Sequence, residues 1–183
     1  MFSRGNNVTI NIRLLLYFGV KAMKTLIVYA GRHGCTQKCA EMLAARAPGG
    51  ITLANLQKCQ ADPSGYDTVI IGGSIRMGKI QKETAAFCRA YHSQLLEKKV
   101  GLFLCCANTN AVESQLQAAF PAELLAAARA VEHLGYAYYF QKMNFLERAV
   151  VKKIAGVSRT VENISQAGVD RLCAALYGEQ SAG

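Results

Sequence analysis

Uninterrupted apolar runs alternate along the chain with stretches in which apolar residues recur every three or four positions. The runs cover Lys24–Ala30, 51–56, 67–73 and 100–106, and a weaker one covers 131–137. Runs of this length, rich in residues that favour β-structure, are typical of strands buried on both faces, as in a parallel sheet. The pattern therefore predicts five strands.

The stretches between these runs have helical periodicity. Helices are predicted over 36–47, 84–95 and 111–128, the last broken at Pro121, and a closing helix has an apolar face made of Val169, Leu172, Cys173 and Leu176. This alternation predicts a doubly wound α/β domain with a five-stranded parallel sheet. The strand order 2-1-3-4-5 fits best, and it places a ligand crevice at the carboxyl ends of the strands.

Residues 1–22 differ from the rest of the chain. A polar stretch at 3–7 is followed by an apolar run at 14–20, which is too short to cross a bilayer. We expect 1–22 to be an N-terminal extension, disordered or upstream of the native start, with a targeting segment as the alternative. The folded domain is expected to cover 23–178.

Length and composition fit one globular domain, with 183 residues of which 51% are hydrophobic. The cysteines lie mostly in apolar patterns and form no C-x-x-C pair, which suggests reduced thiols in a cytoplasmic protein. With only three histidines and no finger spacing, we expect no metal site. The net charge of +9 favours an anionic membrane surface or anionic ligand over nucleic acid, because no basic run of five or more residues occurs.

The loop after the first strand has the features of a phosphate site. A strand, a glycine-containing loop and a helix start present unpaired backbone N–H groups and a positive dipole end to an anion. Here Gly31 and Gly34 permit close approach, and Thr36 can add a hydroxyl. An ordinary strand-to-helix turn is the alternative. The candidate residues are Ala30, Gly31, Arg32, His33, Gly34, Cys35 and Thr36.

The loops after the third and fourth strands would face the same crevice. Ser74 could meet polar atoms of a ligand, whereas Ile75 or Met77 could pack on a flat ring. Each loop taken alone could equally be a solvated turn. The candidate residues here are Ser74, Ile75, Arg76, Met77, Gly78, Ala107, Asn108 and Thr109.

The segment 27–40 (IVYAGRHGCTQKCA) resembles the FMN-binding fingerprint of flavodoxins. The resemblance implies a flavodoxin-like fold with FMN as cofactor. One position departs from the family pattern, because Gly31 stands where a serine or threonine is usual. This departure implies the loss of one side-chain bond to the phosphate.

The segment 72–78 (GGSIRMG) resembles, more specifically, the menaquinone-dependent protoporphyrinogen IX dehydrogenases, also called protoporphyrinogen oxidases. Residues 23–27 and 32–34 agree with that family, and 136–156 resembles its aromatic and basic insertion. The resemblance implies oxidation of protoporphyrinogen IX to protoporphyrin IX in haem biosynthesis, with electrons passed to a membrane quinone. The rivals are an electron-transfer flavodoxin that serves a partner reductase, and a regulatory module with an empty crevice.

The segment 141–159 is basic and amphipathic. It carries five basic residues against Glu147, and Met143, Leu146, Val150, Ile154 and Val157 share one face of a predicted helix. Such a helix can lie on an anionic membrane, dock porphyrin propionates, or simply pack on the domain. We therefore expect a cytoplasmic protein with possible peripheral contact at the inner face of the membrane. We find no catalytic acid, base or nucleophile, because the flavin would carry the redox chemistry.

Overall fold

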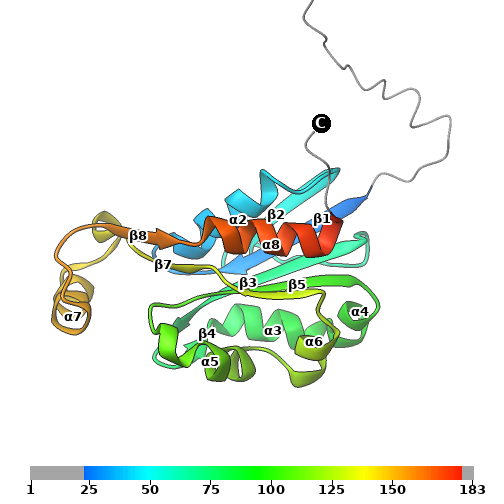
Figure 1. Ribbon diagram of the computed structural model, residues 1–183. Coiled ribbons are helices and arrows are strands. Elements are labelled where there is room, and N and C mark those ends of the chain that lie inside the picture. Colours follow the sequence, from blue (N-terminus) through cyan, green and yellow to red (C-terminus); the bar gives the residue numbers. More distant parts are fainter. Residues whose placement is uncertain (1–22, 179–183) are drawn as a thin grey trace, which may run out of the picture.

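The computed structural model describes residues 23–178, so the expectations for 1–22 lie outside the described residues. Its main sheet contains five parallel strands in the spatial order β2-β1-β3-β5-β6, which is the predicted order 2-1-3-4-5. Figure 1 shows this sheet in the middle of the domain. The strands are β1 (Lys24–Ala30), β2 (Gly50–Asn55), β3 (Thr68–Arg76), β5 (Lys99–Cys105) and β6 (Ala130–His133).

Helices cover both faces of the sheet, as the apolar strands require. On one face lie α2 (Cys35–Ala44) and α8 (Gln166–Tyr177) (Figure 1). The other face is covered by α3 (Lys82–Ala90), α4 (His92–Leu96), α5 (Val112–Ala119) and α6 (Ala122–Ala127). The sheet thereby separates two apolar cores, one around Phe103 and Leu172 and the other around Ile71 and Leu124.

The prediction of a single fifth strand over 131–137 is wrong, because two strands share this segment. It breaks at Gly135, whose φ of 85° lies in the left-handed region. Before the break, β6 pairs with β5; after it, β7 (Gly135–Tyr138) pairs antiparallel with β8 (Val161–Ile164) in a separate sheet. A Cβ on Gly135 would lie 2.0 Å from the carbonyl oxygen of Asn163, so only glycine fits this junction.

Three other boundaries also differ from the sequence prediction. The helix predicted over 36–47 ends at Ala44, and the helix over 84–95 divides into α3 and α4 because the backbone at Tyr91 leaves the helical region. The loop expected at 72–79 is instead a β-hairpin: β3 continues to Arg76 and pairs with β4 (Lys79–Ile80). Met77 and Gly78 form its turn, both with positive φ, a conformation typical of two-residue hairpins.

The predicted amphipathic helix is shorter than the segment 141–159. It is α7 (Phe145–Ala155), which follows the short 3-10 helix η2 (Phe140–Lys142) and extends away from the body of the domain (Figure 1). Asn144 and Glu147 form a capping box at its start, and Gly156 ends it in the left-handed conformation. Met143 therefore lies outside the helix and is buried, and Val157 lies beyond its end.

Candidate functional site

The register of the sheet brings the predicted loops to one edge. Ala30 at the end of β1 pairs with Gly73 of β3, and Ser74 pairs with Cys105 at the end of β5. The loop that starts at Gly31, the hairpin beyond Ser74 and the turn that follows Cys105 therefore begin side by side. This edge is the carboxyl side of the parallel strands, where open α/β sheets bind their ligands.

The first loop holds a buried hydroxyl without a protein partner. Thr36 lies in the first turn of α2 and is buried, and its Oγ1 accepts or donates no hydrogen bond among the described residues. The first backbone bond of the helix runs from the Lys38 N–H to the Gly34 carbonyl at 2.9 Å. Gly34 is the N-cap residue and has no side chain to cap the N–H groups of the first turn that follows it. Together these groups form a donor set for an anion.

Steric crowding by Thr36 explains why position 31 is a glycine. A Cβ built on Gly31 would lie 2.5 Å from Oγ1 of Thr36, which is closer than any side chain permits. A serine at position 31 would therefore require the Thr36 side chain to move. The glycine leaves that space to the Thr36 hydroxyl, at the position where the sequence departs from the flavodoxin pattern.

A lysine from a distant segment lies over the same loop. Nζ of Lys142 would be 2.6 Å from a Cβ on Gly34, whose φ is 99°. The ammonium group also lies 5.3 Å from the ring centre of Tyr139, a cation–π distance. Lys142 thus adds positive charge beside the predicted phosphate loop, although 106 positions separate it from Thr36 in the numbering.

Two glutamines connect the loops. Gln81 donates through Nε2 to Oγ of Ser74 at 3.0 Å, and the backbone N–H of Gly31 donates to Oε1 of Gln57 at 3.3 Å. The Ser74 hydroxyl would lie 3.8 Å from a Cβ on Gly31. The structure therefore brings Ser74 next to the first loop, as the sequence predicted. The hydrogen bond from Gln81, the residue before α3, orients the Ser74 hydroxyl.

Glu147 at the start of α7 connects the insertion to the predicted cofactor loops. Its carboxylate lies 2.9 Å from Nε of Arg32 and 3.1 Å from Nε2 of His33, and 4.0 Å from a guanidinium nitrogen of Arg76. The Asn144 backbone N–H, together with His33 and Arg32, lowers the pKa of Glu147 below its usual value. Three of the predicted site residues thus face a carboxylate in this structure.

The remaining predicted residues have different surroundings. Met77 is 93% exposed at the hairpin tip, whereas Ile75 packs against the apolar core. Ala107, Asn108 and Thr109 are exposed at the turn after β5, where Thr109 begins the 3-10 helix η1 (Thr109–Ala111). Cys35 is buried against the core under α2 and does not face solvent.

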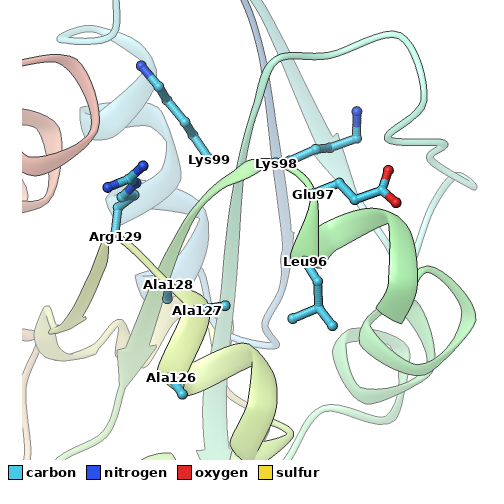
Figure 2. A pocket seen from close by; sticks show the side chains of 8 residues that line it. All are labelled: Leu96, Glu97, Lys98, Lys99, Ala126, Ala127, Ala128 and Arg129. Atoms are coloured by element: carbon cyan, nitrogen blue, oxygen red, sulfur yellow. The ribbon is translucent and has the colours of Figure 1, made fainter.

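A hollow also lies at the opposite end of the sheet. Figure 2 shows a pocket of about 510 Å³ at the amino-terminal ends of β5 and β6, opposite the predicted loops. Lys99 and Arg129 point to one side of it, and Lys98 donates to the Tyr66 carbonyl at 2.7 Å. A smaller pocket of about 270 Å³ lies beside Gly34 and Lys142, between α2 and the insertion.

Comparison with known proteins decides the family. Residues 26–163 match the model of the flavodoxin domain. The chain belongs to the flavodoxin domain family. This family supports FMN as the cofactor, and it confirms the fold predicted from the sequence. No curated protein sequence matches the chain significantly.

Several solved structures resemble this flavodoxin domain. The rubredoxin oxygen:oxidoreductase of Desulfovibrio gigas is 16% identical with a TM-score of 0.51; the match covers 84% of this chain and 37% of that one, so the chain spans little more than a third of that protein. Oxidised flavodoxin 1 of Bacillus cereus is 22% identical (TM-score 0.46, 61% and 82% covered). A flavodoxin mutant of Fusobacterium nucleatum, bound to flavin mononucleotide, is 13% identical (TM-score 0.43, 62% and 69% covered).

The residues present fit FMN. The unpartnered Thr36 hydroxyl and the N–H groups of the first turn suit its phosphate, and Lys142 supplies a nearby cation. Ser74, with its orientation fixed by Gln81, suits polar atoms of the ribityl chain or ring. Gln57, Gln81 and the role of Glu147 were not predicted from the sequence, because their contacts depend on how the loops fold together and not on a local pattern. Only the basic composition of 141–159 pointed toward Lys142.

Proposed function

We propose that this flavodoxin domain is an FMN-dependent oxidoreductase that oxidises protoporphyrinogen IX to protoporphyrin IX and passes the electrons to a membrane quinone. The proposal rests on the resemblance of 72–78 and 136–156 to that enzyme family, and on one structural observation. The insertion that carries the second segment is tied through Glu147 to Arg32 and His33 of the cofactor loop. A partner bound at the insertion would therefore lie next to the flavin.

Bound FMN would supply the acceptor for hydrogen removed from the porphyrinogen and the donor of electrons to the quinone. The chain's own residues would bind and orient the reactants. Thr36 and the loop amides would hold the phosphate, and Ser74 would position the flavin. Arg32, Arg76 and Lys142 carry positive charge around the loops, and this charge suits the carboxylates of a porphyrinogen.

The exposed apolar side chains of α7 support membrane contact. Phe145 is 83% exposed, Leu146 72% and Val150 54%, and Arg148, Lys152 and Lys153 lie on the same short helix. An amphipathic helix of this kind lies in the membrane interface, with each basic residue contributing on the order of 1 kcal/mol on anionic lipid. No helix within 23–178 is long and apolar enough to span a bilayer.

The activity is tested with FMN-loaded protein, without oxygen and with a menaquinone analogue, by following protoporphyrin fluorescence. We expect turnover with the unmodified chain and a loss of at least about tenfold in a Thr36→Ala, Ser74→Ala double variant, since both bonds to the cofactor are absent. Equal rates for the two proteins would contradict the proposal. A Thr52→Ala, Ser93→Ala double variant is the matched control, because Thr52 lies on β2 and Ser93 on α4, away from the three loops.

Membrane contact is tested by flotation with vesicles that contain anionic phospholipid. We expect binding that weakens as salt is added and that a Leu146→Ser variant loses. Leu96, which is 40% exposed on α4 beside the pocket of Figure 2, gives the control Leu96→Ser, which should bind like the unmodified chain. Binding that is unchanged by Leu146→Ser would remove α7 from the proposal.

An electron-transfer flavodoxin is the alternative function. It predicts rapid reduction of the bound FMN by a ferredoxin or flavodoxin reductase, no turnover of protoporphyrinogen and no vesicle binding. Vesicle binding through the exposed apolar face of α7 would favour the first proposal over this one, because a partner reductase does not require contact with lipid.

A further inference from the structure

Three cysteines meet beneath the first turn of α2. Cys35 and Cys39 lie one helical turn apart on α2, and Cys105 ends β5, which packs against that helix. Their three sulfur atoms lie within 4.8 Å of one another, and the Cys39 and Cys105 sulfurs are 3.6 Å apart. All three side chains are buried. The structure therefore brings together thiols that the sequence spacing gave no reason to group.

The sulfur spacing fits coordination of one ion. With metal–sulfur bonds of about 2.3 Å, three sulfurs arranged trigonally around an ion lie about 4 Å apart. The Cys39–Cys105 separation of 3.6 Å and the upper limit of 4.8 Å for the three pairs lie on either side of that value. Small rotations of the side chains would make the triangle regular.

The donor set selects the kind of ion. No histidine, aspartate, glutamate or further cysteine among residues 23–178 joins the group. Structural zinc is almost always four-coordinate, and the buried position leaves little room for water as a fourth ligand. Thiolates alone select soft ions, and among these Cu(I) is well suited to a set of three sulfurs.

We propose that Cys35, Cys39 and Cys105 form a trithiolate site for Cu(I) in the core beneath the cofactor loop, to which Cys35 itself belongs. Each copper–sulfur bond forms as the proton of that thiol leaves to solvent, and no electron is transferred. The positive end of the α2 dipole lies at Cys35 and offsets part of the thiolate charge. Cys35, at the first turn, is the most exposed of the three residues, at 9%.

The test is a competition for Cu(I) between the purified chain, with any FMN it retains, and the chelator bicinchoninate. It is run without oxygen and with a phosphine reductant, which keeps a Cys39–Cys105 disulfide from forming. All proteins carry Cys59→Ser, because Cys59 is an exposed thiol. We expect one Cu(I) per chain to move from the chelator to the protein. X-ray absorption at the copper edge should then show three sulfur neighbours at about 2.3 Å.

The matched variants are Cys39→Ala and Cys88→Ala. Both cysteines are fully buried, but Cys88 lies in the other core, behind the sheet. Loss of a residue that only hydrogen-bonds to a metal ligand already weakens metal sites about 10- to 100-fold. Removal of a ligand itself should therefore weaken copper binding at least about 100-fold in Cys39→Ala. Cys88→Ala should bind normally.

Equal copper affinity in the two variants would overturn the proposal, as would no copper uptake by the parent chain. If Cys39→Ala does not fold, the copper X-ray absorption of the parent protein alone tests whether three cysteines bind the ion. Two sulfur neighbours, or nitrogen and oxygen neighbours, would then exclude the three-cysteine site.

Discussion

At the scale of single residues, the loop geometry makes Thr36 and Gly31 depend on each other. The Thr36 hydroxyl occupies the direction in which a side chain at position 31 would point, and it is buried without a partner. An unmade hydrogen bond of a buried hydroxyl costs about 1–3 kcal/mol. The domain without cofactor thus bears a cost that a bound phosphate would remove.

Thr36→Val should therefore have opposite effects on stability and on binding. Without the unpaired hydroxyl, the free energy of unfolding of the FMN-free protein should rise by about 1 kcal/mol. FMN affinity should fall about ten- to a hundredfold, since a hydrogen bond to a charged group contributes about 1.5–3 kcal/mol. Urea unfolding and flavin fluorescence quenching measure the two quantities.

Thr84→Val is the matched control for that prediction. Thr84 is equally buried, but its hydroxyl donates to the Gly72 carbonyl at 3.3 Å. The same substitution should therefore lower stability at position 84 and leave FMN affinity unchanged. A stability loss at both threonines would show that the Thr36 hydroxyl has a partner in the folded protein.

The carboxylate of Glu147 predicts a pH effect. Its pKa lies below the usual 4.5 because the Asn144 N–H, His33 and Arg32 favour the charged form. The contacts of α7 with the loop should thus be complete above pH 4.5 and weaken as the pH falls through the lowered pKa. Amide NMR signals of α7 followed during acid titration should show this step, and Glu147→Gln should abolish it.

At the scale of elements, α7 and α8 begin alike but differ in surroundings. Asn144 and Ser165 each cap a helix with a side-chain oxygen. Exposed apolar residues occupy α7, whereas α8 buries Val169, Leu172 and Leu176. A capping bond should therefore matter locally in one helix and for the whole domain in the other.

Alanine at the two caps tests this difference. Ser165→Ala should lower the free energy of unfolding of the domain by about 1 kcal/mol. Asn144→Ala should instead speed hydrogen exchange in α7 and leave global unfolding nearly unchanged, because α7 contributes little to the core. Equal losses of global stability would mean that α7 unfolds together with the sheet.

The sequence predicted what is encoded locally. The apolar runs of β1, β3 and β5 and the loop from Gly31 to Thr36 lie where the pattern placed them, because burial on both faces needs no distant partner to be visible. The break at Gly135 was missed because its cause, the Asn163 carbonyl, lies 28 positions later in the numbering. The three-cysteine group and the Glu147 contacts escaped for the same reason.

At the scale of the whole molecule, two parts have different roles. The five-stranded sheet and its helices supply the two cores and the cofactor loops. The segment from β7 to β8 has its own small sheet and carries α7 outward (Figure 1). The two parts meet at Gly135, through Ala137 and Ile164 in the core under α2 and α8, and through the side chains of Glu147 and Lys142.

The register of the small sheet allows the segment between β7 and β8 to be deleted and replaced by a short turn. Tyr138 and Val161 stand opposite each other in the last pair of β7 and β8, so residues 139–160 leave and return at one point. An Asn-Gly dipeptide in their place would close an ordinary two-residue hairpin. The trimmed chain should fold and still bind FMN, but more weakly because it lacks Lys142, and it should no longer float with vesicles. An unfolded product, or one that takes up no FMN, would show that Thr36 and the loop amides do not suffice to hold the cofactor.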